Sequence, residues 1–348
     1  MISIPISLAY ENAWRVFKKK LVPAFWSSPG LGKSTVFKQL AKDKKLKFID
    51  CRLSQFDPTE INGFPVIQNG RSTYAPPAVF PLVGDPLPDM LDDDGKTIGK
   101  YKGWLILFDE YNSASLAVQA ATYQPLLDKT VGQHRLHKNV VIACAGNLST
   151  DRAIVNRMST AAQSRIIHFN IEVSLSDWID WSYLNNIDHR TRSFIEFRPD
   201  LLHKFDPKHT GNTFPCPRTW EFVSKLTGDI KQIGDEHLPL IAGTVGEGAA
   251  HEYVAFGKLF GQLPTLKQIL TDPKGITMPT RPDITYAMSS LLSSNMTQAN
   301  GDTLMEYINR MPPEFQVITL KTATKTNPKL VYVAKIQEWI ADNANDLM

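Results

Sequence analysis

Short apolar runs alternate with polar, helix-compatible stretches over the first 175 residues, and this alternation restricts the fold more than any other feature of the chain. Each run is bounded by turn or charged residues and is rich in the Val, Ile and Phe that are typical of strands buried on both faces. The alternation predicts a parallel sheet covered by helices. We therefore expect an α/β fold with a five-stranded parallel sheet, whose strands cover residues 21–26, 46–50, 104–108, 139–145 and 166–170.

The pattern changes near residue 175. Beyond it, apolar residues recur at helical spacing, as in Trp178, Trp181 and Leu184. At roughly 150 residues per domain, 348 residues correspond to about two domains. We therefore expect an α/β domain over residues 1–175 and a mainly helical domain over residues 176–348.

Residues 51–103 form a long connection between the second and third predicted strands. This stretch is rich in Pro, Gly and Asp, and it includes the acidic turn Asp92-Asp93-Asp94. Because most connections in compact domains are far shorter, the length predicts a helix together with an inserted, functional loop.

Composition and charge exclude several classes of protein. Lys and Arg number 38 against 35 Asp and Glu, so the net charge of +3 lacks the basic excess of a dedicated duplex-DNA binder. The 3 cysteines lie far apart without CxxC spacing, which disfavours a disulfide framework and a zinc ribbon. No segment approaches the roughly 18 apolar residues of a membrane span, and the N-terminus lacks secretory features. We expect a soluble, cytoplasmic protein with no membrane partner.

A candidate phosphate-binding loop follows the first predicted strand and precedes a helix-compatible stretch, Val36 to Lys42. Gly30 and Gly32 allow backbone N–H groups to turn toward phosphate oxygens, and the N-terminus of the next helix favours negative charge. Lys33 would reach the terminal phosphates, and Ser34 would ligate Mg²⁺. Ser27 stands where the strict Gly-x-x-x-x-Gly-Lys-[Ser/Thr] pattern begins with Gly. The candidate nucleotide-binding residues are Ser28, Pro29, Gly30, Leu31, Gly32, Lys33, Ser34 and Thr35.

Polar residues end the third and fourth predicted strands. Asp109 and Glu110 follow residues 104–108, which places them at the carboxyl edge of the sheet, where α/β folds hold ligands. Asp109 suits Mg²⁺, and Glu110 suits the polarisation of water that attacks a γ-phosphate. Asn147 follows the fourth strand, where an amide can orient that water. A charged turn and an Asn-containing turn are the alternatives, but two motifs in the correct order predict a site for ATP and Mg²⁺.

Together, the segments 29–34, 107–110 and 145–147 resemble the Walker A, Walker B and sensor 1 motifs of AAA+ ATPases. Asp-Glu-Tyr-Asn at 109–112 is followed by the segments 119–127 and 130–133, and this series is similar to the MoxR-type branch. In that branch, a helix leads to a hairpin before the sensor 1 strand. The similarity covers most of residues 20–230, and it implies a P-loop sheet followed by a helical lid.

The resemblance also implies two arginines that act on ATP. Residues 158–165 are similar to a helix that ends in an arginine finger, so Arg165 is the candidate and Arg157 is its substitute. Residues 217–220 resemble a sensor 2 element, so Arg218 is expected to approach the phosphates from the second domain. A surface cation or salt bridge is the alternative for each. Because a finger acts on the neighbouring subunit, the resemblance implies a ring, most simply a hexamer.

Two hypotheses for the partner follow. The resemblance implies a ring that remodels or activates a partner protein, and many relatives work with a protein bearing a von Willebrand factor A-type domain. The competing hypothesis is a nucleic acid motor or loader, which the modest charge and the lack of a recognisable nucleic-acid-binding module disfavour.

Several further residues have weaker signals. The lysines within residues 18–20 and 42–47 are most simply a solvated face, with nucleic acid contact as the minority reading. Tyr74 is either a pore-facing aromatic residue or an ordinary packed one. His134 and His137 lack a third ligand, which argues against a metal site.

Overall fold

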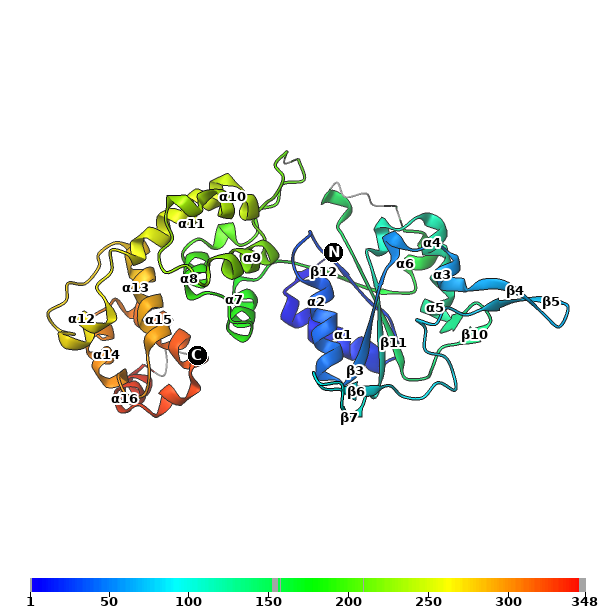
Figure 1. The fold of residues 1–348 in the computed structure, drawn as a ribbon, viewed down its shortest axis with the longest axis horizontal. Helices are drawn as coiled ribbons and strands as arrows, with labels where there is room; N and C mark the ends of the chain where they lie inside the picture. Colours follow the sequence, from blue (N-terminus) through cyan, green and yellow to red (C-terminus); the bar gives the residue numbers. More distant parts are fainter. Residues whose placement is uncertain (1, 152–155, 157, 209, 344–348) are drawn as a thin grey trace. The chain divides into compact units, whose positions relative to one another are not determined.

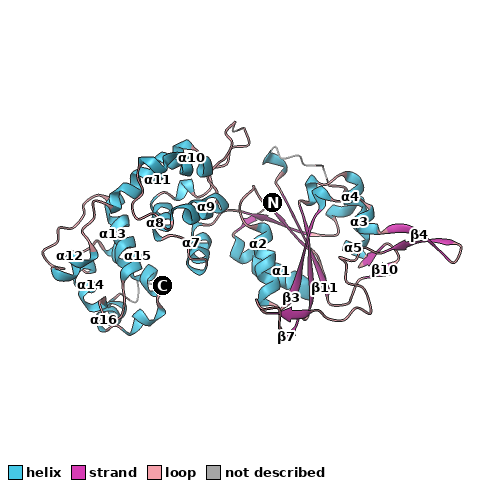
Figure 2. Cartoon of the chain, in the orientation of Figure 1, coloured by secondary structure: helices cyan, strands magenta, loops and turns pink. Residues whose placement is uncertain are grey.

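The structure is a computed structural model that describes residues 2–151, 156, 158–208 and 210–343 (Figure 1). The chain divides into two compact units. The first comprises residues 1–174 and 206–209, and the second comprises residues 175–205 and 210–348. In the described part of the chain, every strand belongs to the first unit, whereas the second is built from helices (Figure 2).

A six-stranded parallel sheet forms the centre of the first unit, with the strand order β1-β12-β2-β11-β8-β3. The five predicted strands are present, but the prediction of a five-stranded sheet is incomplete because β1 adds a sixth strand beside β12. Two residues are too few for a hydrophobic pattern to signal a strand. The strands are β1 (Ser3–Ile4), β2 (Pro23–Trp26), β3 (Leu46–Arg52), β8 (Gly103–Asp109), β11 (Val140–Gly146) and β12 (Ile167–Ile171).

Helices cover both faces of this sheet. On β8, Leu105 and Leu107 pack in the core beneath α1 and α2, while Ile106 and Phe108 pack in the core beneath α3, α4 and α5. Successive side chains of a strand point to opposite faces, so burial on both sides explains the continuous apolar run. The helices of this unit are α1 (Ile6–Lys18), α2 (Lys33–Asp43), α3 (Thr59–Asn62), α4 (Leu116–Ala121), α5 (Tyr123–Leu127) and α6 (Thr160–Gln163).

The long connection between β3 and β8 contains the single-turn helix α3 and two antiparallel hairpins. The predicted insertion is therefore built largely from two hairpins outside the central sheet, β4–β5 and β6–β7. A third, short hairpin precedes β11, as the MoxR resemblance implies. The hairpin strands are β4 (Phe64–Gln68), β5 (Arg71–Ala75), β6 (Asp89–Leu91), β7 (Thr97–Lys100), β9 (Thr130–Val131) and β10 (His134–Arg135).

The second unit contains two hydrophobic clusters, one around Trp220 and Tyr253 and the other around Leu304 and Ile336. None of the helices in the described part of the chain is long and apolar enough to cross a membrane. The helices of this unit are α7 (Leu175–Leu184), α8 (His189–Phe197), α9 (Pro217–Thr227), α10 (Leu238–Val245), α11 (Glu247–Phe260), α12 (Leu266–Thr271), α13 (Pro282–Asn295), α14 (Gly301–Ile308), α15 (Pro313–Thr326) and α16 (Ala334–Asp342).

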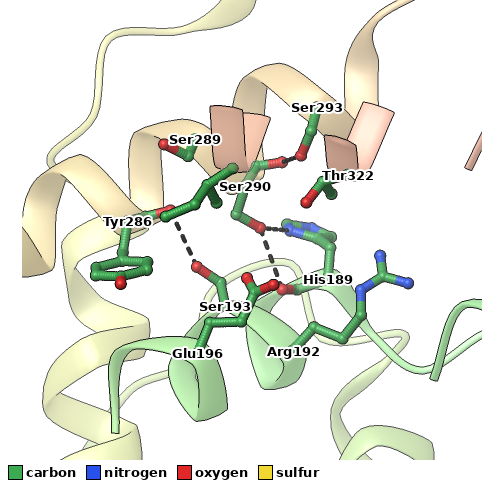
Figure 3. A pocket seen from close by; sticks show the side chains of 10 residues that line it. His189, Arg192, Ser193, Glu196, Tyr286, Ser289, Ser290, Ser293 and Thr322 are labelled. Carbon is green, nitrogen blue, oxygen red and sulfur yellow. Dashed lines mark hydrogen bonds between the residues drawn. The ribbon is translucent and has the colours of Figure 1, made fainter. Parts of the chain in front are cut away.

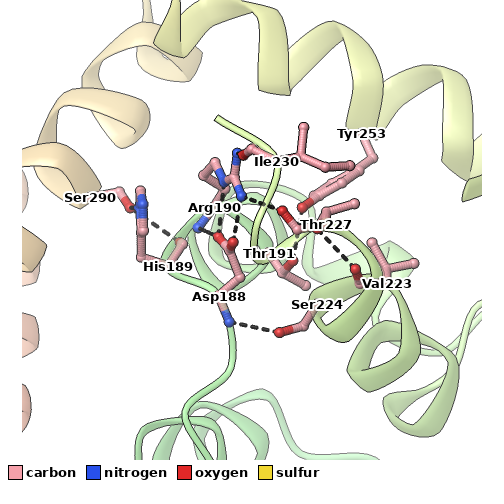
Figure 4. A network of polar contacts seen from close by, with 10 residues as sticks. All are labelled: Asp188, His189, Arg190, Thr191, Val223, Ser224, Thr227, Ile230, Tyr253 and Ser290. Carbon is pink, nitrogen blue, oxygen red and sulfur yellow. Dashed lines mark hydrogen bonds and ion pairs between the residues drawn. The ribbon is translucent and has the colours of Figure 1, made fainter. Parts of the chain in front are cut away.

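A buried ion pair holds the start of α8 against the end of α9 (Figure 4). The Arg190 guanidinium donates to both Asp188 carboxylate oxygens, at 3.0 and 2.6 Å, and to the carbonyl oxygens of Thr227 and Ile230, each at 2.7 Å. Burial alone would raise the pKa of Asp188, but the hydrogen bonds and charge of Arg190 outweigh it and lower that pKa. This network therefore ties the start of α8 to the end of α9 within the helical unit.

Candidate functional site

The loop between β2 and α2 has the backbone conformation that anion binding requires. Gly30 and Gly32 have φ values of 82° and 84°, in the left-handed region that glycine adopts without steric cost. Gly32 directly precedes Lys33, the first residue of α2. The N–H groups of the first turn of a helix lack intrahelical partners and attract negative charge. The loop therefore directs a favourable anion site to the carboxyl edge of the sheet.

Lys33 extends from α2 back across this loop, and only 8% of the residue is exposed. Its ammonium donates to the Ser27 carbonyl oxygen at 2.9 Å and to the Ser27 hydroxyl at 3.0 Å. It also donates to the Ser28 carbonyl oxygen at 3.3 Å and to Oδ1 of Asn147 at 3.2 Å. The structure thus brings the lysine of the loop and the amide after β11 into direct contact.

Ser34 and Asp109 form the second contact of the site. The Ser34 hydroxyl, in the first turn of α2, donates to Oδ2 of Asp109 at the end of β8. The other carboxylate oxygen of Asp109 accepts from the backbone N–H of Glu110 at 2.8 Å. A hydroxyl oxygen beside a carboxylate is the kind of oxygen set that Mg²⁺ prefers, so these residues fit that ion.

Glu110 has a left-handed backbone, with φ of 53°. This conformation is uncommon outside Gly, Asn and Asp, and strained positions of this kind gather at functional sites. The Glu110 carboxylate accepts a hydrogen bond from the Ser54 hydroxyl, just beyond β3. Ser54 has no motif of its own in the sequence, and its role depends on the pairing of β3 with β8.

Asn147 is held by a reciprocal pair of hydrogen bonds with Asn112. The Asn112 side-chain amide donates to the Asn147 carbonyl oxygen at 2.7 Å, and the Asn147 N–H donates to Oδ1 of Asn112 at 3.2 Å. Gly146 leaves the room for this pair, because a Cβ there would lie 2.4 Å from Asn112 Oδ1. Asn112 is part of the segment 109–112, but sequence reasoning assigns it no role.

A third carboxylate, Asp50 on β3, lies near Asp109 and Glu110. Partial burial and the charge of Asp109 raise the pKa of Asp50, and an ion pair with Arg52 at 3.5 Å offsets part of that effect. Asp50, Asp109 and Glu110 therefore concentrate negative charge at the edge of the sheet next to the loop. Such a distribution favours a cation between carboxylates and phosphates.

The structure describes two of the three candidate arginines. Arg165 follows α6, and its guanidinium donates to the Ala161 carbonyl oxygen of the same helix at 2.5 Å. Arg218 is exposed in the first turn of α9 and belongs to the second unit. Arg157 lies outside the described residues. The structure brings Lys33, Ser34, Asp109, Glu110 and Asn147 to one edge of the sheet, whereas the arginine roles stay predictions.

The hairpins carry the weaker candidates. His134 Nε2 lies 3.0 Å from the Tyr74 carbonyl oxygen, and His137 Nδ1 accepts from the Asn139 N–H at 3.1 Å. No group of three metal-ligating side chains occurs in the described residues. Tyr74 is 41% exposed on β5, so it is not an ordinary core residue.

A polar cavity occurs in the second unit between α8, α13 and α15 (Figure 3). Burial raises the pKa of Glu196 to about 7 against the lowering effect of Arg192, and burial lowers the pKa of His189 to about 4. Sequence reasoning missed this cavity because its residues come together only when the three helices pack.

No protein-family model and no curated protein sequence matches this chain. Among solved structures, the chain is similar to a protein from Cytophaga hutchinsonii described as an ATPase candidate. The two share 14% sequence identity and a TM-score of 0.32, over 92% of this chain and 87% of the other. A score this low assigns neither fold nor activity, so the function proposed below rests on the site residues.

Proposed function

We propose that this chain is an ATPase of the AAA+ type that binds ATP and Mg²⁺ at the carboxyl edge of its sheet. The observation that carries the proposal is the meeting of Lys33, Ser34, Asp109 and Asn147 beside a loop with two left-handed glycines. These residues come from the ends of two separate strands, β8 and β11, and from the start of the helix α2. Each side chain has the chemistry that phosphoryl transfer from a nucleoside triphosphate needs.

Each residue has a distinct part in this proposal. The loop N–H groups and Lys33 hold the phosphates, while Ser34 and Asp109 hold Mg²⁺, which neutralises phosphate charge when bound. Glu110 polarises the attacking water, and Asn147 orients it. The Ser54 hydroxyl competes with water for the Glu110 carboxylate, because it already donates to that group.

The assembly and the partner are further parts of the proposal. By resemblance to the MoxR-type branch, the chain works as a ring, most simply a hexamer, that remodels or activates a partner protein. Arg165 acts on the ATP of the neighbouring subunit, and Arg218 acts from the helical lid of its own chain. An adaptor with a von Willebrand factor A-type domain is the partner class that the resemblance suggests.

Replacement of Glu110 by Gln tests the hydrolytic step. We expect Glu110→Gln to retain ATP binding and to lose turnover by about 100-fold or more, because an amide is not a general base. Glu172→Gln removes the same charge at an exposed position of the first unit and is the matched control. Steady-state phosphate release and equilibrium ATP binding separate the two effects, and unchanged turnover in Glu110→Gln contradicts the role of Glu110.

Mixed subunits test the ring. In this proposal, a ring of Arg165→Ala subunits and a ring of Lys33→Ala subunits are each inactive. In a mixed ring, Arg165 of a Lys33→Ala subunit can face the intact phosphate-binding loop of an Arg165→Ala neighbour. We expect ATPase activity to reappear on mixing. Its absence at every mixing ratio, with ring assembly intact by sedimentation, would refute a finger that acts between subunits.

A further inference from the structure

Lysines precede four neighbouring strands of the sheet. Lys20, Lys138, Lys102 and Lys45 lie within three residues of the first residue of β2, β11, β8 and β3, respectively. These strands are consecutive in the sheet and parallel, so their amino ends meet at one edge. At about 4.8 Å between strands, the four starts span roughly 14 Å. This edge lies opposite the edge that carries Lys33 and Asp109.

Contacts join these lysines into one surface. Lys18 and Lys44 both lie over the Trp14 ring, with their ammonium nitrogens 5.8 and 5.1 Å from its centroid. The Lys102 N–H donates to the Lys45 carbonyl oxygen at 2.7 Å, and the Asn139 side chain donates to the Lys102 carbonyl oxygen at 2.9 Å. We name this surface the basic edge, which comprises Lys18, Lys19, Lys20, Lys42, Lys44, Lys45, Lys102 and Lys138.

Acidic side chains offset only part of the charge of the basic edge. No lysine of this set forms a salt bridge with a described residue. Asp43 lies among them, where its carboxylate accepts from the Tyr10 hydroxyl and the Gln39 amide, each at 2.7 Å, and it offsets one of these positive charges.

We propose that the basic edge binds the phosphate backbone of duplex DNA without sequence preference. Lysine is a compact point charge that neutralises phosphates, whereas reading of base edges relies chiefly on planar groups such as Arg, Asn and Gln. Trp14 is half-buried beneath Lys18 and Lys44, so it offers no open platform for the stacking of single-stranded bases. Lysine is also depleted at protein–protein interfaces.

An anionic membrane is the other polyanion that a lysine surface attracts. Membrane-surface sites combine basic residues with a broad apolar face that enters the lipid. Next to Lys20, Leu21 is 49% exposed and has no exposed apolar neighbour within residues 18–26, while the exposed Leu91 and Ile98 belong to the separate β6–β7 hairpin. The charges therefore favour a nucleic acid backbone over lipid.

Salt-dependent binding tests the basic edge, measured without nucleotide so that its outcome is independent of the proposed ATPase. The probe is a fluorescently labelled duplex of about 20 base pairs and mixed sequence, followed by anisotropy between roughly 50 and 200 mM salt. Log affinity falls linearly with log salt concentration, and each phosphate contact adds about 0.9 to the magnitude of that negative slope. We expect Lys18→Gln/Lys19→Gln/Lys20→Gln to lower that magnitude by about 2.7 and Lys102→Gln/Lys138→Gln to lower it by about 1.8.

The control removes the same charge from the second unit. Lys267→Gln/Lys321→Gln/Lys329→Gln replaces three exposed lysines and is expected to leave the slope unchanged. Lys20 has φ of 59°, and Gln retains the Cβ there, so the substitution adds no new backbone strain. The proposal is overturned if the unmodified protein does not bind the duplex at the lowest salt, or if the control lowers the slope as much as the edge variants. Tighter binding to phosphatidylserine vesicles than to DNA also overturns it.

Discussion

Replacement of Lys33 by Ala probes the phosphate site most directly. The ammonium is buried, and it donates to oxygens of Ser27, Ser28 and Asn147 at 2.9 to 3.3 Å. A hydrogen bond to a charged group contributes about 1.5–3 kcal/mol. Loss of one such bond to a terminal phosphate therefore weakens ATP binding by about 10- to 150-fold, at 1.4 kcal/mol per factor of ten.

Calorimetric titration with a non-hydrolysable ATP analogue measures this loss. Lys38→Ala is the matched control, because Lys38 is an exposed lysine on the same helix and its loss changes the net charge equally. Lys33→Met keeps most of the aliphatic stem and separates lost charge from lost packing. Affinity of both Lys33 variants within threefold of the Lys38→Ala protein, with native thermal unfolding, would refute the assignment of the loop as a phosphate site.

Two further predictions concern stability. Gly146→Ala places a Cβ 2.4 Å from Asn112 Oδ1 and 2.5 Å from a Trp26 ring carbon, so we expect a loss of about 1–3 kcal/mol in unfolding free energy. Gly248→Ala is the control, because no atom lies within 4 Å of a Cβ there. Equal urea midpoints for the Gly146→Ala and Gly248→Ala proteins would contradict this prediction. Burial raises the pKa of Glu196 to about 7 from its model-compound value of 4.5, so the folded state binds this proton more tightly than the unfolded state. Its stabilising contribution is complete below about pH 4.5 and is lost as pH rises through about 7, an effect of up to about 3 kcal/mol. Glu196→Gln should therefore remove this pH dependence from the urea midpoint of the second unit between about pH 4.5 and 7. A pH dependence identical to that of the unmodified protein would exclude Glu196 as its source.

Local patterns were sufficient for much of the first unit. All five predicted strands are present. The strands β2, β8 and β11 are almost entirely buried, which produces an uninterrupted apolar run, whereas β3 and β12 are only partly buried. The loop from Ser28 to Thr35 was recognisable because glycine spacing and the following lysine form a contiguous motif. Residues at the ends of strands could be assigned to one edge because parallel strands share their carboxyl ends.

Features that depend on strand order or on packing were out of reach. The contact between Ser54 and Glu110 requires β3 to lie beside β8, and no spacing in the sequence encodes that neighbour relation. The pairing of Asn112 with Asn147 likewise depends on β8 and β11 being adjacent. The strand β1 was missed because it has only two residues, and the hairpins β4–β5 and β6–β7 because their strands are mostly exposed.

The parallel sheet gives the first unit two chemically opposite poles. The seven residues of β8 separate them by roughly 23 Å, at about 3.3 Å per residue. That separation is nearly three Debye lengths at physiological ionic strength, where the Debye length is about 8 Å. Exposed charges at the two poles are therefore largely screened from each other by salt, so substitutions among the lysines of the basic edge should leave the electrostatics of the opposite edge nearly unchanged.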